Sequence, residues 1–391
     1  MGDNSEQTES SRSTDIRCDV LFIISSIQGG GAERKTTLLA GGLAKRGISV
    51  AILTTSPKTD QDFELHPDVR RIQMPGALTN RRGPLARIRA LLGRIRFTRR
   101  EVRKLRPRHI ISLGDSEGLL ALFCRTPESR QCIWTMSSRS LTAAGNPRNR
   151  LLLWLARSRD VLIITQTKAI EHEYRIDGFT RLAMIPNPIS IPELRERPPR
   201  TEGPLKIVSV GRLIPEKSFE TLIDSLAELE KSESGWRCAI IGEGPEDKTL
   251  RDRCEAVGLT EKIEFMGWRE DVRELMRTSD LFVITSFVEG QPNALLEAMS
   301  ESLPSVSTHF TGGAARDLLG STGAGILAPV GDAQAVSDAI RLLMLEPEKR
   351  LKLGALGREA VSRFSVDEVT DQWMDHLGLG RPAHGGNSRH A

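Results

Sequence analysis

Cysteine is scarce and never clustered in this chain, which has five cysteines in 391 residues and no C-x-x-C pair. Scattered single cysteines form neither a disulfide framework nor a zinc site, and they are typical of buried positions in a reducing compartment. Other metal-binding patterns are missing as well, because the sequence has no H-E-x-x-H and no D-x-D at the end of an expected strand. The sequence therefore predicts no metal site.

Long apolar runs are also missing. No segment approaches the roughly 18 apolar residues of a membrane-spanning helix. Residues 1–16 are polar and lack the apolar core of a signal peptide. The formal net charge is only +4, and a content of 39% hydrophobic and 27% charged residues is ordinary for a soluble protein. We therefore expect a cytoplasmic location.

What the chain does contain is a regular alternation of β-branched runs with longer amphipathic stretches. Continuous apolar strands that alternate with helices predict buried parallel sheets, and 391 residues are too many for one small core. The alternation occurs twice, on either side of a proline-rich stretch at 186–204 that suits an extended linker. The sequence thus predicts an α/β fold of two doubly wound, Rossmann-like domains. The expected strands are 20–24, 49–53, 109–112, 132–134 and 161–164 in the first half, and 206–210, 238–241, 263–265 and 281–285 in the second.

Domain boundaries follow from the same pattern. Ser365 and Glu368 form a capping box that predicts the start of a last helix. The expected units are a disordered tail at 1–16, the first domain at 17–190, the linker at 191–204, the second domain at 205–364, the last helix at 365–378 and a flexible tail at 379–391.

The most informative segment is F-V-E-G-Q-P-N-A-L-L-E-A-M, residues 287–299, which follows an apolar strand. Glycine and proline turn the chain there, and Pro292 suits the first turn of a helix. Glu289 would stand in the loop at the carboxyl end of the strand, and Glu297 would share a helix face with Asn293, four residues earlier. Carboxylates bind neighbouring hydroxyls and helix N-termini bind phosphate, so the segment predicts a site for a nucleotide sugar.

This pattern, E-G-x-P-N-x-x-x-E, resembles the signature of glycosyltransferase family four, retaining enzymes of the GT-B fold. Three further segments agree with that family in order and spacing: G-G-G-A-E-R at 29–34, V-G-R-L-I-P-E-K at 210–217 and G-E-G-P at 242–245. The resemblance covers roughly residues 17–377. It implies that the second domain binds a nucleotide diphosphate sugar as co-substrate, that the first binds the acceptor, and that no further cofactor is needed. It also implies that the last helix, 365–378, crosses back to the first domain.

The resemblance also implies a role for each matching residue. Glu297 would hold the ribose hydroxyls and Glu289 the hydroxyls of the donor sugar, whereas solvated surface acids are the plain alternative. Arg212 and Lys217 offer a planar fork and a point charge for a diphosphate, and with Glu289 they are the catalytic candidates. Trp268 would border the base, with core packing as the alternative. The other expected donor contacts are Gly30, Gly31, Gly211, Gly242, Gly244, Gly290, Gln291, Pro292 and Asn293.

The chain departs from the family pattern at two places. Many members have a glutamate shortly after a glycine pair that corresponds to 312–313, where this chain has Arg316. Many also have a histidine in the first domain, where this chain has L-G-D-S at 113–116. Asp115 and Arg139 are therefore the candidate acceptor contacts, and no catalytic base is assigned.

Residues 81–108 are very basic, and an apolar stripe runs through them. A basic amphipathic helix suits an anionic membrane surface, although the stripe must in part pack on its own domain. Nucleic acid is not expected as a partner, because no aromatic stacking platform accompanies the basic residues. We expect peripheral contact with the cytoplasmic face of a membrane through this segment.

The sequence as a whole predicts a retaining glycosyltransferase. It would move a hexose or N-acetylhexosamine from a nucleotide diphosphate sugar, expected to be a UDP-sugar, to a glycan or a polyprenyl-diphosphate-linked glycan in surface polysaccharide assembly. Two alternatives stay open. One is a nucleotide-sugar epimerase of the same fold, and the other is a sugar-binding protein without chemistry.

Overall fold

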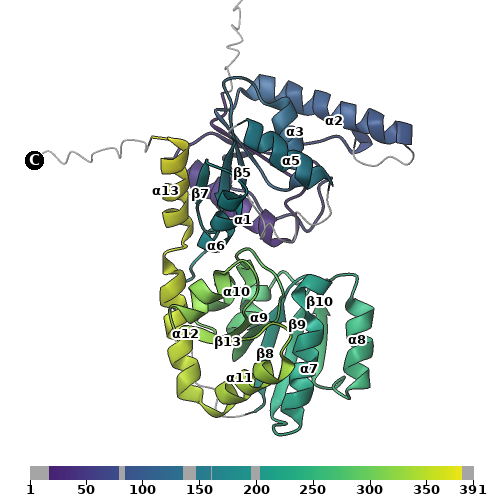
Figure 1. Ribbon diagram of the computed structural model, residues 1–391, viewed down its shortest axis with the longest axis vertical. Helices are drawn as coiled ribbons and strands as arrows, with labels where there is room; N and C mark the ends of the chain where they lie inside the picture. The colour runs from purple at the N-terminus through teal and green to yellow at the C-terminus, as the bar shows by residue number, and fades with distance from the viewer. Residues whose placement is uncertain (1–16, 79–83, 135–146, 160, 195–202, 381–391) are drawn as a thin grey trace, which may run out of the picture.

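Two α/β domains, each built on one parallel sheet, are stacked along the long axis of the molecule (Figure 1). The computed structural model describes residues 17–78, 84–134, 147–159, 161–194 and 203–380. The sequence prediction of two doubly wound α/β domains is confirmed. The expected tails at 1–16 and 381–391 lie outside the described residues, as does most of the expected linker.

The first domain has a seven-stranded parallel sheet in the order β3-β2-β1-β4-β5-β6-β7. Its central strands bury every residue, because helices cover both faces. The strand order reverses between β1 and β4, the place where doubly wound sheets open a ligand crevice. The strands are β1 (Val20–Ile24), β2 (Val50–Thr54), β3 (Val69–Gln73), β4 (His109–Ser112), β5 (Arg130–Trp134), β6 (Leu162–Thr165) and β7 (Leu182–Met184).

Alternate residues of β1 pack on opposite helical layers. Val20, Phe22 and Ile24 belong to one apolar cluster with α1, whereas Leu21 and Ile23 belong to another with α2 and α3. The helices α2, α3 and α5 lie side by side (Figure 1). The helices of this domain are α1 (Gly31–Lys45), α2 (Pro84–Leu105), α3 (Asp115–Cys124), α5 (Pro147–Ser158) and α6 (Lys168–Ile176).

The second domain repeats this topology with six strands in the order β10-β9-β8-β11-β12-β13. Here the order reverses between β8 and β11, so the loops that follow these two strands flank the expected crevice. The strands are β8 (Leu205–Val210), β9 (Trp236–Ile241), β10 (Ile263–Gly267), β11 (Leu281–Ile284), β12 (Ser305–Thr308) and β13 (Gly325–Ala328). The helices are α7 (Phe219–Glu230), α8 (Asp247–Ala256), α9 (Val272–Arg277), α10 (Asn293–Ser300), α11 (Ala333–Leu345) and α12 (Pro347–Ser362).

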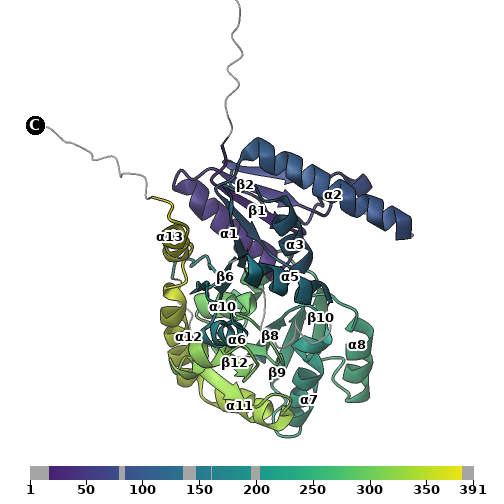
Figure 2. The same cartoon turned by 45° about the horizontal axis from the view of Figure 1, so that its top comes forward.

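The last helix, α13 (Val366–Leu377), leaves the second domain and packs beside α1 of the first (Figure 2). Ser365 caps it by accepting a hydrogen bond from the backbone N–H of Glu368 at 3.2 Å. Trp373 is fully buried and meets Trp134 edge to face, with ring centroids 4.9 Å apart. One apolar cluster therefore runs through both domains and the helix that joins them. Within the described residues, no helix has the length and apolar character needed to span a membrane.

Candidate active site

The loops after β8 and β11 bring Lys217 and Glu289 together. The β11 loop is tied to the short helix Pro215–Lys217, because the Thr285 hydroxyl donates to the Ser218 carbonyl at 2.8 Å. Lys217 forms an ion pair and a hydrogen bond with Glu289, and the Ser286 hydroxyl donates to the same carboxylate at 2.8 Å. Glu289 is only 8% exposed, so its charge is held by this cation and hydroxyl rather than by water.

Arg212 and Gly211 follow β8 directly, at the mouth of the same crevice. Arg212 is exposed, and its positive charge acts on the carboxyl of Glu33 in the first domain. Burial raises the pKa of Glu33, and the positive charges of Lys35 and Arg212 work against that rise. Arg212 and Lys217 thus both follow β8, and Lys217 pairs with Glu289 of the β11 loop.

Helix α10 points its N-terminus into this crevice and carries Glu297 one turn further on. Pro292 precedes its first residue, Asn293, in an extended conformation, and the loop residues Gly290 and Gln291 are buried beside it. Glu297 is 7% exposed, and burial raises the pKa of its carboxyl, while Arg34 and Arg273 favour the charged form. Glu289, Glu297 and the α10 N-terminus thus line one side of a common site.

Gly242 and Gly244 lie at the end of β9 and pack against the β8 loop. Gly242 has φ +141°, and a Cβ there would lie 1.9 Å from the Gly211 carbonyl oxygen. A Cβ on Gly244 would lie 2.1 Å from the Leu213 carbonyl oxygen. These glycines are therefore needed to bring two loops of the crevice into contact, which is a requirement of packing. Their contact with a donor stays a prediction.

The glycine loop before α1 touches the second domain. The Asn293 side chain donates a hydrogen bond to the Gly31 carbonyl at 2.6 Å. A Cβ on Gly29 would lie 2.9 Å from Nε1 of Trp268, so Trp268 stands against this loop. Gly30 lies between these contacts, at the N-cap of α1. The two domains are thus in contact across the predicted donor site.

A residue of the interdomain segment, Asn187, joins this network and was not predicted from the sequence. Its backbone N–H donates to Oε1 of Gln291 at 2.6 Å. Its side-chain amide donates to the Gln291 carbonyl at 2.9 Å and to Oδ1 of Asn293 at 3.0 Å. Asn187 therefore fixes the loop that leads into α10. The only sequence signal was an asparagine between two prolines, which also suits a linker.

Of the two candidate acceptor contacts in the first domain, the structure describes Asp115. Asp115 begins α3 at the carboxyl end of β4, after Gly114, which has φ +91°. Burial raises the pKa of the Asp115 carboxyl, and Arg148 of α5 opposes the rise. Arg139 lies outside the described residues. Asp115 thus remains the described acceptor candidate.

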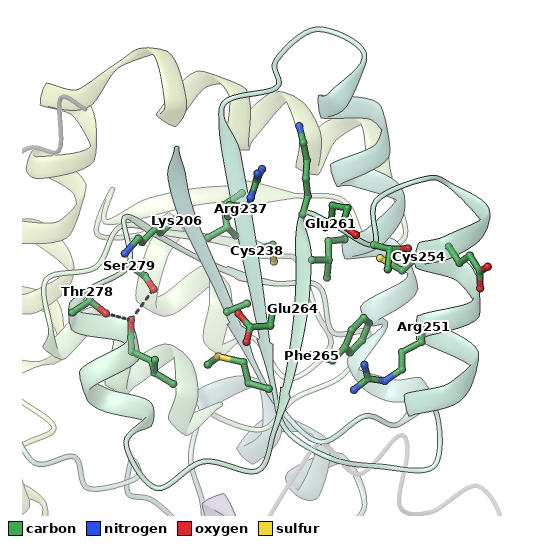
Figure 3. A pocket seen from close by; sticks show the side chains of 18 of the residues that line it. Lys206, Arg237, Cys238, Arg251, Cys254, Glu261, Glu264, Phe265, Thr278 and Ser279 are labelled. Carbon is green, nitrogen blue, oxygen red and sulfur yellow. Dashed lines mark hydrogen bonds between the residues drawn. The ribbon is translucent and has the colours of Figure 1, made fainter. Parts of the chain in front are cut away.

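Cavities elsewhere do not coincide with this crevice. A cavity of about 780 Å³ lies in the second domain over β9 and β10, beside α8 and α9, and Figure 3 shows Arg237, Glu264 and Arg251 around it. None of the predicted site residues lines it. A second cavity, of about 300 Å³, lies between the start of α6 and the 309–313 loop. In the described part of the chain, no group of three or more His, Cys, Asp or Glu residues could hold a metal ion.

Two family models match the two halves of the chain. One, described as a glycosyl transferase 4-like domain, matches residues 30–188, and the other, described as glycosyl transferases group 1, matches residues 190–360. The chain belongs to the family-four-like GT-B glycosyltransferases. The resemblance deduced from the four motifs is therefore confirmed.

Curated relatives of this glycosyltransferase match over part of their length. An exopolysaccharide phosphotransferase from Streptomyces coelicolor is 30% identical over 227 residues, which are 57% of this chain and 24% of the relative. LpsE from Rhizobium meliloti, a lipopolysaccharide core biosynthesis glycosyltransferase, is 29% identical over 172 residues, which are 44% of this chain and 49% of that protein. An N-acetyl-D-galactosaminyltransferase from Campylobacter jejuni, whose name specifies an undecaprenol-diphosphate-linked acceptor, is 24% identical over 169 residues, 43% of this chain and 46% of the relative. The chain thus spans between about a quarter and half the length of these relatives.

Solved structures show the same fold over nearly the whole chain. TarM from S. aureus, in complex with UDP among other ligands, aligns with a TM-score of 0.77 at 11% identity, covering 92% of this chain and 100% of that one. HepE from Anabaena, in complex with UDP and glucose, aligns with a TM-score of 0.74 at 19% identity, covering 93% and 100%. At these identities the likeness establishes the GT-B fold.

Proposed function

We propose that this protein is a retaining glycosyltransferase that transfers a hexose or N-acetylhexosamine from a nucleotide diphosphate sugar, with UDP as the nucleotide. The observation that carries the proposal is the pairing of Lys217 with Glu289 just before the N-terminus of α10, with the buried Glu297 one turn along that helix. A nucleotide sugar matches these groups. Its sugar hydroxyls can bind Glu289, its diphosphate can bind Lys217 and the helix N-terminus, and its ribose can bind Glu297. UDP in the structures of TarM and HepE supports the choice of nucleotide.

The charges of the crevice suit departure of a diphosphate. Arg212, Lys217 and the free N–H groups at the start of α10 would stabilise the negative charge that develops on the leaving group. Glu289 would orient the sugar hydroxyls, because a buried carboxylate accepts strong hydrogen bonds. In the proposed reaction the acceptor hydroxyl attacks the anomeric carbon, the bond to the diphosphate breaks, and the hydroxyl proton passes to the leaving phosphate. No protein nucleophile and no metal ion take part in this scheme.

The proposed acceptor is a glycan or a polyprenyl-diphosphate-linked glycan of surface polysaccharide assembly. The names of the relatives support this class, since they refer to exopolysaccharide, to lipopolysaccharide core and to an undecaprenol-linked substrate. Asp115 at the start of α3 is the proposed contact of the first domain with the acceptor.

The surface of α2 supports contact with an anionic membrane. The inner stripe of this helix packs on its domain at Thr98, Val102 and Leu105, which are buried. The first half of the helix projects beyond the rest of the domain (Figure 1). The same apolar stripe is therefore exposed there: Ile88 is 56% exposed and Leu91 is 53% exposed. The helix carries eight basic residues and a single acidic one. Exposed apolar groups beside many cations are the combination that binds anionic bilayers.

The neighbouring helices extend this surface. Helix α3 packs between α2 and α5, and it exposes Phe123. Helix α5 exposes Leu151 and Trp154, the latter at 62%, and its charged residues are all arginines. Tryptophan is favoured at the membrane interface because its ring is apolar and its N–H remains in reach of polar groups. We therefore place the proposed membrane contact on α2, α3 and α5 together.

A screen of nucleotides and nucleotide sugars by thermal unfolding tests the donor proposal. A ligand that binds the native state raises the melting temperature. UDP and at least one UDP-sugar should raise it, and the shift should be lost in Lys217→Met, because the diphosphate loses its point charge. An epimerase would also bind the donor but would leave the sugar attached to UDP, and a mere sugar-binding protein would respond to the free sugar. No response to any nucleotide would refute the proposal.

A further inference from the structure

Arg34 reaches from the first domain to the carboxylate that is proposed to hold the ribose. It lies in the first turn of α1, directly after the glycine loop. Its Nε atom is 2.8 Å from Oε1 of Glu297, on α10 of the second domain. Its guanidinium carbon stands 5.6 Å from the centre of the Phe63 ring, which supports the side chain from its own domain. An arginine thus pairs with the carboxylate that is proposed to bind the ribose.

Arg34 and Glu297 lie close together, but the geometry of their contact is not that of a hydrogen bond. Among the described residues, neither Nε of Arg34 nor Oε1 of Glu297 has a hydrogen-bond partner, although both atoms are buried. A buried carboxylate oxygen without a hydrogen bond is unfavourable. A ligand hydroxyl that donated to this oxygen would remove that cost, so the arrangement favours exchange of the arginine for a ligand.

Glu297 would keep a cation nearby after such an exchange. Arg273 of α9 also favours the charged form of its carboxyl. Arg273 is anchored by the interdomain segment and by α10, because it donates to the Ser190 carbonyl at 2.5 Å and to the Ser300 hydroxyl at 3.2 Å. The carboxylate therefore does not become an isolated buried charge when Arg34 leaves.

The start of α10 offers Arg34 a second partner within reach. Asn293 and Glu297 are four residues apart, which is about 6 Å along a helix axis. The Asn293 side chain is hydrogen-bonded to the Gly31 carbonyl, three residues before Arg34. The base of the Arg34 side chain is thus held near the helix N-terminus where the proposed diphosphate would lie. A guanidinium can form two parallel hydrogen bonds with a phosphate.

We propose that Arg34 is a donor-binding residue with two partners in turn: Glu297 before the donor binds, and the donor diphosphate once the ribose hydroxyls have bound to Glu297. This inference rests on the proposed function. It predicts opposite effects on two ligands, because a nucleoside must displace Arg34 without offering it a phosphate, whereas a nucleoside diphosphate displaces it and binds it again. Arg34 would therefore weaken the binding of uridine and strengthen the binding of UDP.

The test compares uridine and UDP binding, by NMR or calorimetric titration, in the wild type, Arg34→Gln and Arg46→Gln. Arg46 is the matched control, because its Nε is also 2.8 Å from a carboxylate of a packed partner element, Asp371 of α13, away from the crevice. In Arg34→Gln, we expect uridine to bind at least about threefold more tightly and UDP at least about threefold more weakly. Arg46→Gln should leave both affinities unchanged.

Two results would overturn the inference. Uridine affinity that stays equal or falls in Arg34→Gln would show that Arg34 does not compete for Glu297. A fall of both affinities by the same factor would indicate a merely structural role. Arg34→Lys, which keeps the charge but loses the fork, should retain more UDP affinity than Arg34→Gln, and its melting temperature controls for folding. If the wild type binds UDP, the proposed function stands whatever the variants do; if it binds neither ligand, the proposed function fails and this inference with it.

Discussion

At the scale of the residue, the proposed active site is distinguished by buried carboxylates. Glu289 and Glu297 are both more than nine-tenths buried, and each has a cation close to it. Burying such groups costs free energy that a purely structural helix or loop would avoid. Sequence patterns pointed to both glutamates, because Glu297 interrupts an otherwise apolar helix and Glu289 stands in the loop after an apolar strand. They did not point to Arg34 as the partner, because its contact with Glu297 forms only when the two domains meet.

Replacement of Glu297 should weaken donor binding. Glu297→Ala removes a charged acceptor of ribose hydrogen bonds, each of which contributes roughly 1.5–3 kcal/mol. The KM for the donor should rise by a factor of about ten or more. Glu348→Ala, which removes an exposed carboxylate of α12, is the control and should leave KM unchanged. Steady-state kinetics with both variants measure this, and wild-type values for Glu297→Ala would exclude the ribose role.

Lys35 makes the stability of the fold depend on pH. Burial lowers the pKa of its ammonium group from 10.5 to about 7, with Glu33 opposing the change, and its Nζ lies 4.2 Å from the Trp134 ring centre. Because the unfolded chain binds this proton up to a higher pH than the native one, Lys35 makes stability rise from about pH 7 to about pH 10. Below pH 7 both states are protonated, and the buried charge is a constant cost.

Lys35→Met should remove this pH dependence. Between about pH 7 and pH 9, the wild type should gain roughly 2 kcal/mol of unfolding free energy relative to the variant. Urea unfolding at the two pH values measures the difference. If the free energy of unfolding changes with pH by the same amount in both proteins, Lys35 keeps an ordinary pKa in the folded state.

At the scale of the element, apolar runs in the sequence predicted most strands, and the strands β3 and β12, which are rich in polar residues, were missed. β1 agrees with its prediction at both ends. β12 was missed because its sequence, S-V-S-T, is polar although every residue is buried; its Ser305 and Thr308 hydroxyls donate to backbone carbonyls. β3 was missed because it carries two arginines at the edge of its sheet.

Loop contacts between distant elements were the least predictable part of the site. The motif segment 287–299 could be placed on a strand end and a helix start, since local turn and helix signals fix both. Its partner Asn187 lies in a stretch whose prolines are equally typical of a linker. The hydrogen bond between Asn187 and Gln291 joins residues that are 104 positions apart in the sequence, and no local sequence pattern predicts such a contact.

Helix α2 should direct the protein to anionic membranes. Arg89 and Arg96 are exposed on it, and each basic residue near such a surface contributes about 1 kcal/mol. The double change to glutamine should therefore lower binding to anionic liposomes by roughly tenfold or more at low salt. The same change at Lys248 and Lys352, which are exposed on the second domain, removes equal charge and should have little effect. Co-sedimentation with anionic and neutral vesicles measures this, and equal binding to both would contradict the membrane proposal.

At the scale of the whole molecule, several independent elements hold the two domains in contact. The glycine loop meets α10 and Trp268, the segment around Asn187 meets the motif loop, and α13 carries Trp373 from the second domain to the first. The first of these contacts lies at the proposed donor site, whereas the contact at α13 lies away from it. The two-domain fold was predictable because strand and helix signals are local. The closed contact was not, because it depends on side chains from both domains.

A chelator should leave the activity of the whole enzyme intact. Arg212, Lys217 and the α10 N-terminus are proposed to supply the positive charge that a divalent ion would otherwise provide at the diphosphate. Turnover of the donor in EDTA should equal turnover without it. Loss of activity in EDTA that manganese restores would show that the crevice works with a bound metal.

A proton NMR time course of UDP-sugars incubated with the protein, with water as the acceptor, tests the central claim most directly. For one UDP-hexose or UDP-N-acetylhexosamine, the account predicts release of UDP, with the free sugar appearing first as the same anomer that it had in the donor. Lys217→Met should abolish this release. The account would be contradicted by an inverted first anomer, by a sugar that is epimerised while still attached to UDP, or by the absence of any cleavage across the panel of UDP-sugars.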